Sequence, residues 1–379
     1  MPSKTVVIIG GSYSGIGVAK ALLKSSPGVK IVIIDPSDRF YFNIAAPRIL
    51  AKPEAFSPDK YLYPITTIFR GASKDSFEFV QNTVSQIDTS SKVVTTSNGI
   101  ISYDYLVIAS GSSSQSTKGD GVFAPFKPTG VDSRAFQVQI KAAQDTVAAA
   151  ESIIIGGAGP LGVEIAGELS DTSNHKNITV IASSSRILPM LKEGPSSTAE
   201  KLLAKKNVNI VKGASVIGAS QNGTKWIVKL STGKEMAADA YIATTGVVPN
   251  SSFIPSEYLV NGWVNVDPHL RVATPGNLSQ RPQGVYAVGD ITIHSPRTLI
   301  KANEQVPVVA ANIKADIDGG PKLKTYNAAA GSIMMAVPVG ENAGTGQAFG
   351  WTIWGKLVSM MKGKDFMISR APGMIGISS

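Results

Sequence analysis

Residues 5–35 read TVVIIGGSYSGIGVAKALLKSSPGVKIVIID, and residues 152–186 read SIIIGGAGPLGVEIAGELSDTSNHKNITVIASSSR. Each segment begins with a run of β-branched residues, passes through a Gly-rich turn into a helix with small residues on one face, and ends in a second apolar strand. One such segment is weak support for a dinucleotide fold, but two in the same chain are strong support. The sequence therefore predicts two Rossmann-like units.

The Gly-rich turns read GxSxxG at residues 10–15 and GxGxxG at residues 157–162. The first glycine permits the tight turn, the second lets the backbone approach a pyrophosphate, and the third lets the helix pack against the strand. The helix N-terminus supplies N–H donors and the positive end of the helix dipole. The residues that we assign to cofactor binding here are Gly10, Gly11, Ser12, Tyr13, Ser14, Gly15, Gly157, Gly159 and Gly162.

The two units differ where the second strand ends. Asp35 ends this strand in the first unit, and a carboxylate at this point accepts hydrogen bonds from a ribose 2′-hydroxyl. The second unit has Ser183 to Ser185 followed by Arg186, and no carboxylate. An arginine suits a 2′-phosphate better than a bare ribose. The end of this strand in the second unit therefore modestly favours NADPH as the coenzyme, and NADH remains an alternative.

The composition restricts the chemistry. The chain has no cysteine and only three histidines, His175, His269 and His294. Structural disulfides, thiolate nucleophiles, Fe–S clusters and Cys-ligated zinc are therefore excluded, and we expect no metal site. Redox chemistry would have to belong to a bound organic cofactor. The formal net charge of +9 favours anionic partners, namely nucleotide phosphates, acidic lipid headgroups or nucleic acid.

Four further stretches complete the pattern. Residues 284–290, GVYAVGD, read as a short strand that ends in Asp290, which we expect to hydrogen-bond the polyol chain of a flavin. Residues 264–272 read as a return to the first unit. The stretches 105–111 and 241–250 are strands ending in small residues, which suits a chain that crosses between two nucleotide domains.

In their order, these motifs resemble the two-dinucleotide-binding-domain flavoproteins of the pyridine nucleotide-disulfide oxidoreductase family, over residues 5–313. One departure is that residues 40–48, FYFNIAAPR, lack the redox cysteine pair of the disulfide reductases, which excludes a thiol relay. NIAAPR at 43–48 and GENAGTGQ at 340–347 are most similar to the AIF-like, ferroptosis suppressor protein group and its fungal relatives. Similarity to type II NADH dehydrogenases is weaker.

The resemblance implies an α/β fold with two Rossmann-like domains, an FAD domain interrupted by an NAD(P)H domain, plus a small α+β C-terminal domain. The expected segments are 1–120 and 253–325 for FAD, 121–252 for NAD(P)H, and 326–379 for the C-terminal domain. It also implies that Arg48, Val84 and Asp290 touch FAD together with the first turn, Val84 through its backbone at the adenine. Relatives in this group reduce quinones and are linked to membranes or cell death.

Hydride transfer from a nicotinamide to a flavin needs few protein groups, because the protein mainly positions the two rings. Glu164, early in the second helix, is placed to orient the nicotinamide, although the helix dipole alone also favours an acid there. In the resembled group the helix after Asp290 points its N-terminus at the flavin. Arg297 and Lys301 would add positive charge there, and Gln305 would line the acceptor pocket; surface positions are the alternative for each.

The tail combines aromatic, methionine and lysine residues. At helical spacing Phe349, Trp351, Trp354, Leu357, Val358 and Met361 would form an apolar stripe. Such a stripe most often packs in a protein core or in the interface of a homodimer. Two alternatives are weak contact with a membrane surface, with the lysines beside the stripe, and a position in the wall of a quinone pocket. Pro2 stands where N-myristoylation requires glycine, so we expect no such anchor. We expect a cytoplasmic protein, peripheral to membranes or mitochondria-associated.

The sequence thus predicts an FAD-dependent NAD(P)H oxidoreductase with a lipophilic, quinone-like acceptor and with oxygen as a slow one. A reductase of a protein partner is the alternative among enzymes. A redox-sensing flavoprotein that acts in cell death by binding a partner or nucleic acid is the alternative of another class. Clustering of the positive charge on one face would favour the latter, and even dispersion would favour the enzyme.

Overall fold

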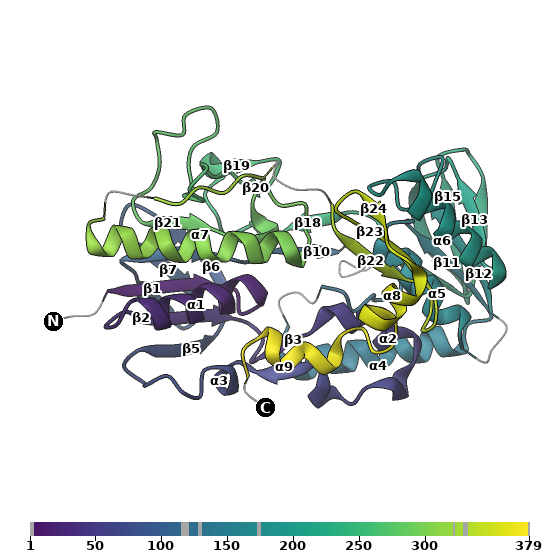
Figure 1. Ribbon diagram of the computed structural model, residues 1–379, viewed down its shortest axis with the longest axis horizontal. Coiled ribbons are helices and arrows are strands. Elements are labelled where there is room, and N and C mark those ends of the chain that lie inside the picture. Colours follow the sequence, from purple (N-terminus) through teal and green to yellow (C-terminus); the bar gives the residue numbers. More distant parts are fainter. Residues whose placement is uncertain are drawn as a thin grey trace.

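The computed structural model describes residues 4–114, 121–127, 131–172, 176–320, 323–328 and 333–377. Pro2 and His175 lie outside these ranges. Figure 1 shows two α/β units side by side, with the last part of the chain packed between them.

The first unit is built on a parallel sheet with the strand order β21-β9-β1-β2-β5. Its strands are β1 (Thr5–Ile9), β2 (Lys30–Asp35), β5 (Phe77–Gln81), β9 (Tyr105–Ile108) and β21 (Val285–Ala287). All four ladders are parallel, and the inner strands β1 and β9 are buried apolar runs, whereas the edge strand β5 contains Glu78 and Gln81 and is only partly buried. β21 comes from far along the chain and lies within residues 284–290, where the sequence predicts a short strand.

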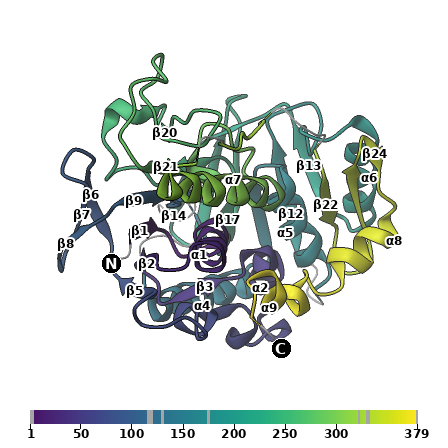
Figure 2. The same cartoon turned by 60° about the vertical axis from the view of Figure 1, so that its left-hand side comes forward.

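Helices α1 (Tyr13–Ser25) and α7 (Leu299–Asp318) pack against each other beside this sheet (Figures 1 and 2). Gly17 lies at the contact, where an added Cβ would meet both methyl carbons of Val306 at 3.1 Å. A glycine here therefore allows the two helices to approach closely.

The second unit has a parallel sheet with the order β13-β12-β11-β17. Its strands are β11 (Ser152–Gly156), β12 (Asn177–Ala182), β13 (Asn209–Lys212) and β17 (Ala240–Ala243), and its helices are α4 (Ser133–Ala149), α5 (Pro160–Ser170) and α6 (Glu193–Lys205). An antiparallel sheet of β14 (Val216–Asn222), β15 (Lys225–Leu230) and β16 (Glu235–Ala238) packs behind it. The predicted α/β class with two dinucleotide folds is confirmed; the domain boundaries stay predictions.

The two crossings between the units lie together. β10 (Ser112–Ser114) leaves the first unit, β18 (Val247–Pro249) returns to it, and the two strands pair antiparallel, with Ser112 opposite Pro249. The remaining short elements are β3 (Arg39–Tyr41), β4 (Leu62–Pro64), β6 (Val84–Asp88), β7 (Val93–Thr96), β8 (Gly99–Ser102), β19 (Leu259–Val260), β20 (Trp263–Val264), α2 (Ala46–Ala51) and α3 (Ile65–Ile68).

The tail differs from the predicted helical stripe. It forms an antiparallel sheet of β22 (Met335–Pro338), β23 (Gly344–Ala348) and β24 (Trp351–Thr352), followed by α8 (Gly355–Val358), a π-helical turn (Ser359–Gly363) and α9 (Ala371–Met374). Phe349 and Gly350 have φ of 50° and 82° and join β23 to β24. A positive φ at both loop residues is typical of a tight two-residue hairpin. The prediction of a helical stripe over residues 349–361 is therefore wrong at this point.

The side chains of this tail divide between core and surface. Val358, placed in the predicted stripe, is fully buried, whereas Phe349, Trp351 and Trp354 are 76%, 80% and 83% exposed. The stripe is therefore not a packed core face. Among the described residues, no helix is long and apolar enough to cross a membrane.

Candidate functional site

The first Gly-rich turn has the geometry of a dinucleotide cradle. Gly10 has a φ of 113°, and a Cβ there would meet the carbonyl oxygen of Ala109 at 2.4 Å. A Cβ on Gly15 would lie 1.9 Å from the carbonyl oxygen of Gly10. Ser12, the N-cap of α1, makes no side-chain cap hydrogen bond, so N–H groups of the first turn are available to an anion. These backbone features fit the diphosphate of FAD.

Asp35 lies at the carboxyl end of β2, beside this turn. Its Oδ2 accepts from the N–H of Gly11 at 2.7 Å, and its Oδ1 accepts from the N–H of Ser37 at 2.8 Å. Burial raises the pKa of the Asp35 carboxyl, and the two N–H donors oppose that rise. Each oxygen keeps lone-pair capacity for a ribose hydroxyl, as the sequence predicts.

The second turn repeats this arrangement. Gly157 has a φ of 112°, and a Cβ on Gly162 would lie 2.1 Å from the carbonyl oxygen of Gly157. Thr244 Oγ1 donates to the carbonyl oxygens of Gly156 and Gly157 at 2.9 and 3.0 Å, which holds the turn against β17. The third glycine of each turn is thus a packing requirement, in line with the motif.

Both turns border one cavity of about 1810 Å³, well above the roughly 300–1,000 Å³ typical of a pocket for one small ligand. The predicted site residues that line it are Gly10, Gly11, Ser12, Tyr13, Ser14, Asp35, Val84, Gly157, Gly159, Glu164, Asp290, Arg297 and Lys301. Gly15, Arg48, Gly162, Arg186 and Gln305 are not among the lining residues.

Two ion pairs stand inside this cavity, each with a lysine that sequence reasoning missed. Asp290 pairs with Lys127 and accepts from Ser112 Oγ at 3.3 Å. Glu164 Oε1 lies 2.5 Å from Lys362 Nζ, and both residues line the cavity. Burial raises the pKa of the Glu164 carboxyl, although the Lys362 ammonium opposes this. Both lysines are remote in sequence from their acids, so no local motif indicates them.

Arg48 is placed away from the cavity, in a buried cluster. Its guanidinium makes two hydrogen bonds to the Glu168 carboxylate, at 2.8 and 2.9 Å, and donates to the carbonyl oxygens of Gly363 and Lys364. Its Cζ lies 4.9 Å from the Phe366 ring centroid. The side chain thereby connects α2, α5 and the tail, and four of its five N–H donors are already engaged. The contact with FAD that the resemblance implies stays a prediction.

Arg186 also has protein partners. Its guanidinium donates to the carbonyl oxygens of Leu191 and Pro189, at 2.6 and 2.9 Å. At the end of β12 the residues that line the cavity are Ser183 and Ser184. Arg186 would have to exchange these carbonyl acceptors to meet a 2′-phosphate.

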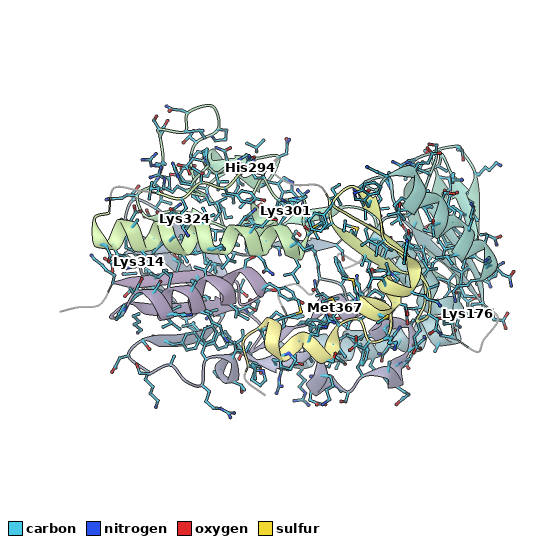
Figure 3. The ribbon with its side chains drawn as sticks, viewed as in Figure 1. Lys176, His294, Lys301, Lys314, Lys324 and Met367 are labelled. Atoms are coloured by element: carbon cyan, nitrogen blue, oxygen red, sulfur yellow. The ribbon has the colours of Figure 1, made fainter. Side chains whose placement is uncertain are left out.

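The N-terminus of α7 borders the cavity as well. Arg297, with a φ of 58°, places its Cζ 3.8 Å from the Trp263 ring centroid, and Lys301 pairs with Glu304 at 2.8 Å. Gln305 is fully buried, and its Oε1 accepts from the N–H of Gly289 at 2.7 Å. Gln305 therefore supports the strand end that carries Asp290. Figure 3 labels Lys301 on α7 and Met367 on the tail.

The described residues contain no group of histidines and acids able to hold a metal ion. Residues 4–306 match the model of the pyridine nucleotide-disulphide oxidoreductase family. The protein belongs to this family. It is an oxidoreductase with FAD and NAD(P)H as cofactors, and both turns fit that use.

Relatives of nearly the same length narrow the comparison. The chain is 34% identical to the oxidoreductase ptaL of Pestalotiopsis fici, over 97% of this chain and 98% of the relative. It is 28% identical to ferroptosis suppressor protein 1 of Homo sapiens, over 96% and 94% of the two chains. It is 25% identical to a type II NADH:quinone oxidoreductase of Staphylococcus saprophyticus, over 95% and 93%. The predicted resemblance to the ferroptosis suppressor group is confirmed.

Proposed function

We propose that this protein is an FAD-dependent NAD(P)H:quinone oxidoreductase. The observation that carries the proposal is that one cavity is bordered by both Gly-rich turns and is also lined by apolar residues of the tail. A dinucleotide at each turn would extend toward a common chamber, where a lipophilic acceptor meets the tail. The quinone named in the Staphylococcus saprophyticus relative supports this class of acceptor.

Each part of the cavity then has a role. Residues 10–14, Asp35, Val84 and Asp290 would hold FAD, which when bound accepts a hydride from the nicotinamide and supplies electrons to the acceptor. Residues 157–159, with Ser183 and Ser184, would hold the nicotinamide coenzyme. The N-terminus of α7 presents the positive end of its dipole to the cavity, which would favour negative charge on a group bound there.

The pair of Glu164 and Lys362 would orient the nicotinamide and keep a proton near the reacting groups. The pair comes from α5 and from the tail, so it forms only when the tail is docked. The raised pKa of Glu164 brings this carboxyl closer to the range in which a side chain exchanges protons during turnover.

The exposed tail supports weak membrane contact. Phe349, Trp351 and Trp354 stand exposed on or beside the hairpin, with Lys356 nearby in α8. We refer to Phe349, Trp351 and Trp354 as the aromatic patch. Aromatic side chains suit the interface region of a bilayer, and neighbouring lysines suit anionic headgroups. Burial of the same patch in a homodimer is the competing explanation.

Rapid-mixing absorbance measurements test the proposed function. The purified protein should be yellow and release FAD on denaturation, and NADPH or NADH should bleach the flavin band in a single turnover. Reoxidation should be fast with quinones and slow with oxygen. A flavin that NAD(P)H does not reduce, or that a redox protein reoxidises faster than any quinone does, would contradict the proposal.

A further inference from the structure

The tail supplies several methionine residues to the lining of the cavity. Of the nine methionines in the chain, six line the cavity. They are Met190, Met334, Met335, Met361, Met367 and Met374. Five of them belong to the tail, and we call these five residues the methionine wall; Met190 lies instead at the second Gly-rich turn, where its Cε is 4.0 Å from the position of a Cβ on Gly159. Met236 and Met360 are the other methionines among the described residues, and neither lines the cavity.

The methionine wall includes a neighbour of the ion pair and two partly exposed residues. Lys362, which pairs with Glu164, directly follows Met361. Met361 and Met374 are 42% and 37% exposed, and Phe349, 76% exposed, also lines the cavity. A ligand in this cavity therefore has the cation of Lys362, the acid of Glu164 and the ring of Phe349 among the residues that line the cavity together with the wall. Figure 3 labels Met367, one of these residues.

Methionine gives such a wall a particular chemical preference. The side chain is unbranched and flexible, and its polarisable sulfur makes favourable contacts with aromatic rings at about 5 Å. A flat, rigid ring system also loses little conformational entropy on binding, whereas an isoprenoid chain must be ordered along its length. The wall therefore matches a fused-ring face better than a branched aliphatic tail.

We propose that the acceptor is a planar polycyclic aromatic quinone without an isoprenoid chain, bound against the methionine wall with one oxygen toward Lys362. This inference rests on the proposed function. The net reaction is NAD(P)H + H⁺ + quinone → NAD(P)⁺ + hydroquinone. The coenzyme loses a hydride, and the quinone gains two electrons and two protons, one on each oxygen.

The test measures binding to the oxidised holoenzyme by quenching of tryptophan fluorescence, which does not require turnover. The probes are 1,4-benzoquinone, 1,4-naphthoquinone, 9,10-phenanthrenequinone, and 2-methyl-1,4-naphthoquinone with and without an isoprenoid side chain. The dissociation constant should fall as rings are added, and the isoprenoid chain should not tighten binding. Equal dissociation constants across ring number, or clearly tighter binding of the tailed quinone, would overturn the proposal.

Variants locate the effect on the wall. In Met361→Leu/Met367→Leu, the dissociation constant for phenanthrenequinone should rise about three- to tenfold, as expected for two lost sulfur–ring contacts. Benzoquinone binding should change less than about twofold. Met360→Leu, an exposed neighbour outside the wall, is the matched control and should change neither. Identical behaviour of the double variant and this control would refute the role of the wall.

The single-turnover rate of flavin reduction by NAD(P)H distinguishes a failure of the proposed function from a failure of the proposed class of acceptor. If this reduction fails in the wild-type holoenzyme, the proposed function is wrong, whatever the ring series shows. If reduction proceeds normally and tailed quinones bind best, only the polycyclic class of acceptor is wrong.

Discussion

Replacing Arg48 with methionine tests the buried cluster that joins α2, α5 and the tail. The exposed fractions of the Arg48 and Glu168 side chains are only 5% and 0%, so the variant leaves a carboxylate buried without its main partner. Breaking such a pair costs about 3–5 kcal/mol. Lys52 Nζ remains 3.3 Å from Glu168 Oε2, so we expect the lower end, about 3 kcal/mol.

Thermal unfolding of the holoprotein and the apoprotein measures this loss. For 379 residues, at an unfolding entropy of about 2.1 cal/mol/K per residue, a loss of about 3 kcal/mol corresponds to a fall in Tm of about 4 °C. The variant also removes the donors to the carbonyl oxygens of Gly363 and Lys364, so hydrogen exchange should become faster near these residues. Flavin content should stay near that of the wild type at a temperature where the variant is folded.

A second variant removes the buried charge as well. Arg48→Met/Glu168→Gln leaves no unpaired carboxylate, so it should lose less stability than the sum of the two single variants. Our reasoning would be refuted if Arg48→Met unfolded like the wild type in the absence of flavin and instead lost FAD. That result would support the flavin contact implied by the family resemblance.

Three further variants test the cavity and the tail. Arg186→Ala should raise the KM for NADPH more than that for NADH if Arg186 leaves its carbonyl partners to bind a 2′-phosphate; equal changes would argue against this role. Because burial raises the pKa of the Glu164 carboxyl, this group ionises at a pH above the ordinary pKa of a glutamate. The rate of flavin reduction should therefore change in that pH range, and Glu164→Gln should remove the change. An unchanged pH profile in the variant would exclude Glu164 as the titrating group. Trp351→Ala with Trp354→Ala should weaken the binding of the protein to anionic vesicles, and the binding that remains should depend on salt, because each well-placed lysine or arginine contributes about 1 kcal/mol. The same double variant should slow quinone reduction but leave the rate of flavin reduction by NADPH unchanged. Unchanged sedimentation with vesicles would leave dimer packing as the role of the patch.

The sequence was sufficient for features that depend on the local backbone. Gly10, Gly15 and Gly162 are required because a Cβ would collide with a neighbouring carbonyl oxygen, and such needs recur in every turn of this type. Asp35 is predictable for the same reason, since the end of β2 is fixed relative to the turn. These positions could be identified without knowing how the units pack.

Contacts between remote segments could not be predicted in this way. Lys362 meets Glu164 across 198 residues of sequence, and Arg48 meets Glu168 across 120. The positions of these residues in the sequence do not indicate that either pair is in contact. The hairpin at Phe349 and Gly350 was missed because its apolar residues also match a helical period, and the positive φ of both loop residues decided the outcome.

The pairing of β10 with β18 constrains how the coenzyme enters. Because both crossings form one hydrogen-bonded ribbon, any relative rotation of the two units must take place about this ribbon. Figure 1 places α2 well away from it, and there the two bonds between Arg48 and Glu168 connect the units a second time. A hinge opening would have to break this buried connection in every catalytic cycle. Exchange of NAD(P)H is therefore expected to proceed through a standing opening of the cavity, with the two units keeping their relative orientation throughout turnover.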